Sequence, residues 1–473
     1  MPTQPGGYAQ PQSNYLPPNY PQQTYPQLGY PHGYAWPAPP VRPPVKHSPL
    51  RWVVVVACVL VICVFGSVGA IVGIGDLAGV ERQTISWRPA ELPIDSPPPV
   101  NAPASEWNAW ARQAVDTSVR NQAAALVAGD EARYLAPADP DNTGLVADLQ
   151  RRYRTLREMG VGQWNQTIRT TPKVIGELSW SADIKVSYCF GDPTCRLNDV
   201  VLGTEWRLRN DRLSMTDLAV TEADQYGPRP WEKGELSIGR GSRVVVATTQ
   251  QYGGRLAETV AMADRAAKVA DSFAKWKPAP SQYVAFIAGR SEWSTWYSLE
   301  QPEWAGGVYI HQTDNEVVIN GPYTLMENME ALLTHEFTHV ATMAGAREGA
   351  SNSAWWLIEG TADYATMIGK PVSKYDPDSL SAVRSYVNGG WDGDPAVDYP
   401  GDGATLEEAT ASYGIAFLAV RRIADVYGQD RMLDFFGKIV HDDLTAEAAS
   451  TQALGKTWST VKADCAQFIR NVV

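Results

Sequence analysis

Histidine, cysteine and positive charge are all scarce in this sequence. Of its 473 residues, six are histidine and five are cysteine, and 40 lysines and arginines face 52 aspartates and glutamates, for a formal net charge of −12. Five cysteines in so long a chain exclude a small disulfide scaffold, and the negative charge argues against nucleic acid as the main partner. The length predicts two or three units, and a hydrophobic content of 44% is enough for a substantial core.

Residues 1–50 lack the aliphatic periodicity of a folded segment. They are rich in proline, glutamine and tyrosine, as in "YPQQTYPQLGYPHGY". Such a composition buries too little apolar surface to offset the entropy lost on ordering, so a disordered cytoplasmic tail is predicted. Its tyrosines recur at short intervals, and two interpretations stay open: a site for a cytoplasmic partner, or a solvated tail.

A charge-free apolar run, "WVVVVACVLVICVFGSVGAIVGIG", occupies residues 52–75. It is long enough for an α-helix to cross a hydrocarbon layer of about 30 Å, so we predict one transmembrane helix over residues 51–75. A secretory signal would have a shorter apolar core nearer the N-terminus. A buried helix of a soluble protein is seldom this long and this free of charge.

The charges around the run predict its orientation. Basic residues precede it and acidic residues follow it: Arg42, Lys46, Arg51, Asp76 and Glu81. By the positive-inside rule, we predict a single-pass protein of the cell membrane with a cytoplasmic N-terminus and the remaining residues outside. There, Cys189 and Cys195 can form a disulfide across "CFGDPTC"; two free buried thiols are the alternative.

Three segments follow the apolar run. Residues 76–105 contain "RPAELPIDSPPPVNAPAS", a proline-rich linker that acts as a semi-extended spacer. Residues 106–225 begin with helical patterns and continue with alternating segments such as "ADIKVSYCF", which predicts a small α+β domain. In residues 234–473, the runs "RVVVATT" and "QYVAFIAG" predict strands around a helix, "GGVYI" and "EVVIN" predict a strand pair, and the pattern is helical after Pro322.

Two of the six histidines lie four residues apart in "LLTHEFTHVATM", residues 332–343. Thr324 and Glu327 have the spacing of a capping box, and Gly345 is a suitable stop. The pattern therefore predicts a helix over residues 324–344 that carries both histidines.

This helix would bring the histidines together. Side chains four residues apart on a helix are neighbours, about 5–6 Å apart at Cβ, so His335 and His339 can bind one ion at about 2.0–2.1 Å. Glu336 is rotated about 100° from His335 and can accept a proton from a water molecule beside the ion. This is the HExxH arrangement of zinc peptidases; two histidines that are simply hydrogen-bonded in a helix are the alternative.

The feature that favours a metal lies downstream, in "WWLIEGTADYATMIG" at residues 355–369. This predicted apolar helix carries Glu359 and Asp363, and isolated acids on it are costly unless something pairs with them. A zinc ion supplies the partner, with Glu359 as the third ligand and Asp363 holding a ring N–H of a ligating histidine. Three protein ligands leave a fourth position open, as in catalytic zinc sites.

HExxH followed about twenty residues later by W-L-x-E-G-x-A-D-Y resembles the gluzincin zinc metallopeptidases. Within them it is similar to the peptidase MA-like group, the relatives of thermolysin and aminopeptidase N. The resemblance covers residues 240–473 and implies an α+β, zincin-like fold, with a small mixed sheet and a mainly helical C-terminal part. The metzincin pattern does not fit, because it needs a glycine at 342 and a histidine at 345, where this chain has Thr342 and Gly345.

The resemblance also implies roles for named residues. The zinc ligands would be His335, His339 and Glu359, the general base Glu336, and the residue supporting a ligand Asp363. Related enzymes stabilise the oxyanion with a tyrosine or histidine, and Tyr413 is the candidate here; a core tyrosine bonded to the backbone is the alternative.

Weaker candidates surround this group. A strand at the position of "WAGGVYI" pairs with the substrate in similar enzymes, and Gly306 and Gly307 would permit close approach; a glycine-containing hairpin is the alternative. His311 and His441 more readily fit surface or loop positions.

The resemblance predicts a zinc-dependent metallopeptidase, and the apolar run predicts that it is membrane-anchored and cleaves a peptide or protein substrate outside the cell membrane. The alternative is a non-catalytic, peptidase-like envelope protein that acts as a binding or assembly module. Glu336 favours the enzyme, because a binding module has no use for it. A third hypothesis, a soluble enzyme with an uncleaved signal, differs only in anchoring.

Overall fold

A computed structural model describes residues 91–473, except for a few internal positions: 194, 221–226, 299–301, 303, 312, 314, 322–327, 348 and 351–353. The predicted tail, the predicted transmembrane helix and the first part of the linker lie outside the described residues. Within the described residues, no helix combines the length and apolar character needed to cross a membrane. The described residues belong to one compact unit, Ser86–Val473.

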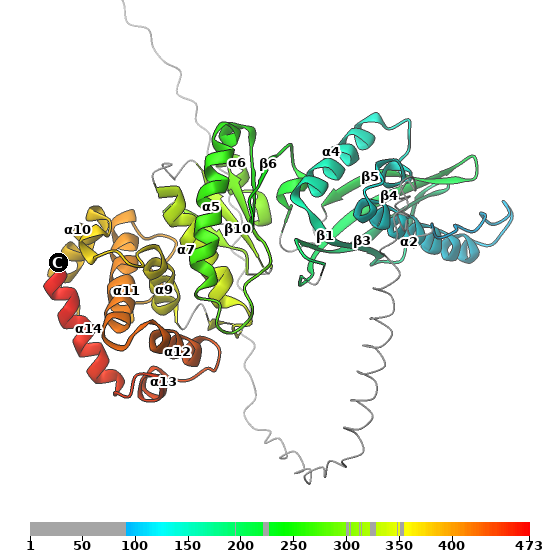
Figure 1. Cartoon of the computed structure of the whole chain (residues 1–473). Helices are drawn as coiled ribbons and strands as arrows, with labels where there is room; N and C mark the ends of the chain where they lie inside the picture. Colours follow the sequence, from blue (N-terminus) through cyan, green and yellow to red (C-terminus); the bar gives the residue numbers. More distant parts are fainter. Residues whose placement is uncertain are drawn as a thin grey trace, which may run out of the picture. The chain divides into compact units, whose positions relative to one another are not determined.

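The first folded part places helices before an antiparallel sheet, as the sequence predicts (Figure 1). Its elements are α2 (Ala104–Ala128), α3 (Glu131–Leu135), α4 (Thr143–Met159), β1 (Val161–Ile168), β2 (Lys173–Gly176), β3 (Ser179–Phe190), β4 (Asn198–Arg209) and β5 (Arg212–Val220). The strands are ordered β1-β3-β4-β5, with β2 beside β3. The Asn142 side chain caps the start of α4, and Gly160 ends it at φ 75°.

Cys189 and Cys195 form a disulfide at the end of β3, with Cα atoms 6.0 Å apart. This confirms the predicted pairing. The loop that it closes contacts the next part of the chain, where the Asp192 backbone N–H donates to Ser281 Oγ at 3.3 Å.

The second sheet is mixed, as the resemblance noted in the sequence implies. Its strands, in spatial order, are β6 (Ser237–Arg240), β7 (Val244–Thr248), β8 (Tyr283–Ala288), β10 (Glu316–Asn320) and β9 (Gly307–Tyr309). The inner strands β7, β8 and β10 are parallel, and the edge strands β6 and β9 are antiparallel to their neighbours. Helix α5 (Leu256–Asp271) connects β7 to β8.

Both faces of this sheet are buried. Alternate residues of β7 and β8 enter two different cores: Val244, Val246 and Ala285 pack with helices α5 and α7, while Val245 and Phe286 pack with the first sheet and its helices. Period-2 alternation is therefore absent, and the strands are continuous apolar runs in the sequence. The boundary between residues 106–225 and 234–473 stays a prediction, but the two parts share one core across this sheet.

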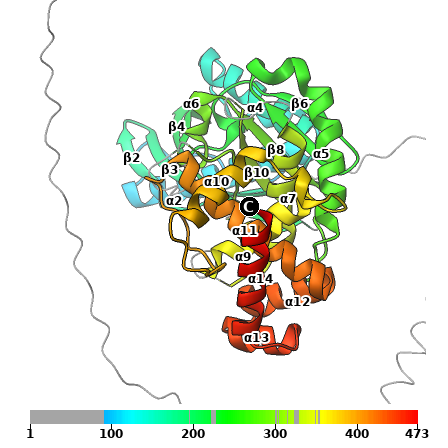
Figure 2. The same ribbon diagram turned by 90° about the vertical axis from the view of Figure 1, so that its left-hand side faces the viewer.

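Helices dominate the rest of the chain (Figures 1 and 2). They are α7 (Met329–Met343), α9 (Trp355–Thr366), α10 (Pro377–Asn388), α11 (Leu406–Tyr427), α12 (Gln429–Val440), α13 (Ala446–Ala453) and α14 (Trp458–Val472). Shorter elements are α6 (Arg290–Trp293) and the 3-10 turns Pro230–Glu232, Gln250–Arg255, Trp296–Ser298 and Val372–Lys374. The α+β class is confirmed.

Helix α7 fits its prediction in part. Gly345 has φ 81°, the left-handed conformation expected just after a helix. The described helix begins at Met329, and the predicted capping pair Thr324 and Glu327 lies outside the described residues.

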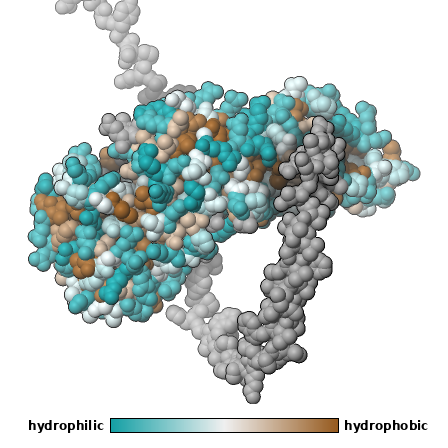
Figure 3. All heavy atoms as spheres, viewed as in Figure 1, coloured by the Kyte–Doolittle hydropathy of each residue, from teal (hydrophilic) through white to brown (hydrophobic). Residues whose placement is uncertain are grey.

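The described surface in Figure 3 is mainly hydrophilic, with apolar residues in small groups, so the apolar content of these helices lies mostly inside.

A buried carboxylate joins the two sheets. Glu316 on β10 is 0% exposed, and it accepts hydrogen bonds from Asn198 Nδ2 at 3.1 Å, the Tyr188 hydroxyl at 3.5 Å and the Tyr297 hydroxyl. Tyr188 and Asn198 belong to β3 and β4 of the first sheet. Burial raises the pKa of Glu316 to about 7, although its hydrogen bonds and Arg229 act in the other direction.

Glu316 should make stability depend on pH. Since its pKa rises from 4.5 in the unfolded chain to about 7 in the folded one, its ionisation opposes folding, and the penalty appears as pH rises through this range. Relative to Glu316→Gln, wild type should lose roughly 3 kcal/mol of unfolding free energy between pH 5 and pH 8, measured by urea denaturation. The exposed Glu205→Gln is the control; a pH-independent difference for Glu316→Gln would contradict the prediction.

Candidate metal centre

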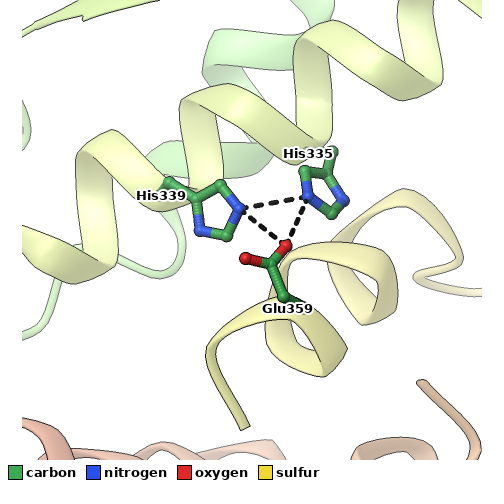
Figure 4. A group of neighbouring side chains, drawn as sticks. All are labelled: His335, His339 and Glu359. Carbon is green, nitrogen blue, oxygen red and sulfur yellow. Dashed lines mark hydrogen bonds and ion pairs between the residues drawn. The ribbon is translucent and has the colours of Figure 1, made fainter. Parts of the chain in front are cut away.

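Three predicted ligands meet between helices α7 and α9 (Figure 4). His335 and His339 lie one turn apart on α7, and their Nε2 atoms are 3.0 Å apart. Glu359 on α9 places Oε2 3.1 Å from the first and 3.2 Å from the second. The three atoms form a nearly equilateral triangle, so one ion could contact all of them.

The size of this triangle fits a zinc ion. Three ligands of a tetrahedral ion with bonds of about 2.0 Å lie about 3.3 Å apart, close to the 3.0–3.2 Å separations here. Two imidazoles and one carboxylate are also the donor set of catalytic zinc sites with three protein ligands. The residues present therefore fit the metal that the sequence predicts.

The electrostatics of the group call for a positive charge. Glu336, Glu359 and Asp363 surround two imidazoles, and His335, Glu336 and His339 are 9%, 3% and 6% exposed. Burial opposes charging of His335, yet its hydrogen bonds to Asp363 and Glu359 hold its pKa well above the usual value. Burial likewise opposes ionisation of Glu359, but the two imidazoles hold the pKa of this carboxyl well below its usual range. A proton on the His335 imidazole thus supplies the positive charge that a bound cation would otherwise supply.

Asp363 orients one ligand. Its Oδ1 lies 2.8 Å from His335 Nδ1, which leaves Nε2 for the ion. The other oxygen, Oδ2, accepts from the Tyr375 hydroxyl at 3.0 Å. Tyr375 was missed from the sequence, because it follows α9 in a segment without a motif. Its ring stacks on Phe417 of α11 at 4.1 Å, so the helical core indirectly holds the histidine.

Glu336 lies against the edge strand of the second sheet. Burial raises the pKa of its carboxyl, and the two nearby imidazoles act in the other direction. A Cβ on Gly307 would lie 2.5 Å from Glu336 Oε1, so any larger residue there would displace the Glu336 carboxylate. The Asn320 backbone N–H donates to the Gly306 carbonyl at 2.8 Å, which fixes the start of β9.

The register of β9 decides which backbone groups face outward. Gly306 and Ile310 are bonded to β10, and Gly307 stands opposite Ile319. Because bonded and non-bonded pairs alternate between antiparallel strands, the N–H and C=O of Gly307 point away from β10. They lie at the open edge of the sheet, beside Glu336.

Tyr413 on α11 lies next to the ligands. Its ring centroid is 6.2 Å from that of His335 and 5.0 Å from that of Trp355. Burial raises the pKa of its phenol well above the usual value, and the carboxylates of Glu359 and Glu336 add to this effect. No described residue forms a hydrogen bond with its hydroxyl.

The weaker histidines lie outside the group. His441 Nε2 is 2.9 Å from the Thr342 carbonyl, and its ring stacks on Trp276 at 4.4 Å, so it supports the C-terminal end of α7. His311 is exposed, and partial burial of its ring lowers its pKa. Neither belongs to the described ligand cluster.

Comparisons with known proteins add little. No family model matches the chain, and no curated protein matches it. Among solved structures, yeast LTA4 hydrolase in complex with bestatin is similar at 12% identity and a TM-score of 0.29, over 59% of this chain and 53% of that one. The chain thus spans about half the length of that structure, and a likeness this distant carries no argument.

Zinc binding should depend on the three predicted ligands. Purified protein should hold about one zinc ion per chain, and removing it with a chelator should lower the melting temperature by several degrees, because the ion binds the folded state. His335→Ala and Glu359→Ala should abolish both effects, whereas His311→Ala should keep them. Metal analysis and calorimetry check this; stoichiometric zinc in both ligand variants would contradict it.

Proposed function

We propose that this chain is a zinc-dependent metallopeptidase of the gluzincin type. One observation carries the proposal: Glu336 is buried beside three converging ligand atoms and faces the open edge of a strand. A structural metal site needs the ligands alone. A carboxylate beside them, next to free backbone groups, is what hydrolysis of an extended peptide requires.

The chain's own residues supply most of the chemistry. Bound at His335, His339 and Glu359, zinc would polarise the scissile carbonyl and make a water molecule more acidic. Glu336 accepts a proton from that water and passes it to the leaving amine. Burial raises the pKa of its carboxyl, which favours the protonated form that donates to the amine. Asp363 keeps the His335 ring in place throughout.

Two further elements would act on the substrate. The Tyr413 phenol, protonated and without a partner among the described residues, donates to the oxyanion that forms at the scissile carbonyl. Gly307 offers its N–H and C=O to the peptide backbone, so that the substrate extends the second sheet by one strand. This addition would align the scissile bond with Glu336.

We also propose that the enzyme is anchored in the cell membrane and works outside it. The apolar run at residues 52–75 and the charges around it support the anchor. The disulfide between Cys189 and Cys195 supports an oxidising compartment. A peptide or protein is the substrate, and the N-terminal tail is available to a cytoplasmic partner.

Replacing Glu336 tests the function directly. Glu336→Gln should keep zinc and lower peptide cleavage by a factor of about 10²–10⁴, because it removes the proton acceptor without removing a ligand. Glu330→Gln, on the exposed side of the same helix, is the control and should be fully active. The measurement is cleavage of a peptide library by zinc-loaded protein. Stoichiometric zinc without cleavage of any peptide by wild type would favour the alternative, a peptidase-like binding module.

Replacing Tyr413 tests its role in catalysis. Tyr413→Phe should lower kcat by a factor of about 10²–10³ with little change in KM, since the donor acts mainly in the transition state. Tyr427→Phe, at the far end of the same helix, should behave as wild type. Steady-state kinetics measure both; an unchanged kcat in Tyr413→Phe would show that Tyr413 only packs.

A further inference from the structure

Four aromatic side chains form a cluster beside the metal centre: Trp304, Trp355, Tyr399 and Tyr413. The Trp304 ring lies 5.9 Å from Tyr399 and 6.0 Å from Tyr413, and Trp355 lies 6.2 Å and 5.0 Å from the same two rings. Through Tyr413 the cluster reaches His335. It runs from the buried Trp355 to Tyr399, which is 44% exposed.

Trp304 carries a buried donor, its Nε1 atom, without a hydrogen-bond partner among the described residues. Other described indoles do have partners: Trp110 donates to the Asp95 carbonyl at 2.9 Å, and Trp391 donates to the Asp394 carbonyl at 2.9 Å. Buried donors are normally paired, so the unpaired N–H beside a candidate active site points to a partner that arrives with a ligand.

The backbone at Trp304 is firmly held. The next residue, Ala305, donates its N–H to the Pro302 carbonyl at 3.1 Å and accepts from Asn320 Nδ2 at 3.3 Å. Gly306, the residue after that, is bonded to β10. The backbone that carries the indole is therefore held close to Gly307, at the start of the strand that would align the substrate.

We propose that Trp304 is a substrate-binding residue: its indole N–H donates to a carbonyl oxygen of the bound peptide, and its ring helps to hold a large apolar side chain of that peptide. The proposal rests on the proposed peptidase function. An indole nitrogen can only donate, and the peptide carbonyl is the acceptor that every peptide substrate offers. The four side chains of the cluster carry no charge, so they favour an apolar side chain over a basic or acidic one.

The test combines two variants with two kinds of ligand. Trp304→Phe keeps a ring and removes the N–H, and Trp304→Ala removes both. The ligands are peptides that carry Phe, Leu, Ala or Lys next to the scissile bond, and matched analogues in which single carbonyl groups are reduced to methylene. Cleavage is measured on the zinc-loaded full chain, and binding is measured by calorimetry on the same protein with Glu336→Gln.

Trp304→Phe should raise KM and Kd about tenfold for all cleaved peptides and leave kcat, zinc content and melting temperature unchanged. One methylene analogue should bind wild type about tenfold more weakly than its parent, and Trp304→Phe should not distinguish the two. The preference for Phe and Leu over Ala and Lys should persist in Trp304→Phe and fall in Trp304→Ala. Trp391→Phe, which also removes an indole N–H, is the matched control and should equal wild type.

The outcomes separate this proposal from the peptidase itself. If wild type cleaves peptides and Trp304→Phe has the same KM and Kd as wild type, the proposed hydrogen bond is overturned. The proposed peptidase function is not affected by that result. If wild type prefers peptides with Lys next to the scissile bond, the proposed binding of a large apolar side chain is overturned. If Trp304→Phe does not fold, the methylene analogues are tested on wild type alone. The hydrogen bond is overturned if none of them binds wild type more weakly than its parent peptide. Zinc-loaded wild type that neither cleaves nor binds any peptide overturns both proposals.

Discussion

The burial of negative charge between helices α7 and α9 governs the organisation of this protein. Three carboxyl groups, the buried Glu336 and the partly buried Glu359 and Asp363, surround two imidazoles. Carboxylates are retained in such a place only when a positive charge compensates them. The apolar surfaces of both helices, the bond from Asp363 to His335 and the support from Tyr375 all serve to hold the donor atoms around that charge.

The sequence predicts most of what local periodicity controls. The spacing of His335 and His339 depends only on the turn of a helix, and so does that of Glu359 and Asp363, so both pairs could be found without a structure. The strands of the second sheet could be predicted from their continuous apolar runs. The sequence alone did not show why these runs do not alternate, because that depends on what covers the second face.

Residues whose role depends on distant contacts could not be predicted. Tyr375 matters through Asp363, and Trp304 through its distance from Tyr413, and neither position belongs to a motif. Glu316 looks like an ordinary polar residue at the start of a strand, yet it is completely buried and bonded to side chains more than a hundred residues earlier. A single sequence does not indicate which residues so far apart are in contact, because only the folded topology brings them together.

The second sheet, covered on both faces, also bears on how this protein could have changed over time. Val245 and Phe286 pack into the core of the first sheet, while Val246 and Ala285 pack with helices α5 and α7. A gene fragment that encoded only the C-terminal part would expose one complete face of apolar side chains and leave the Glu316 carboxylate without two of its donors. The two parts must therefore be inherited together, and recombination that exchanged the first for an unrelated domain would have to rebuild half of a core at the same time.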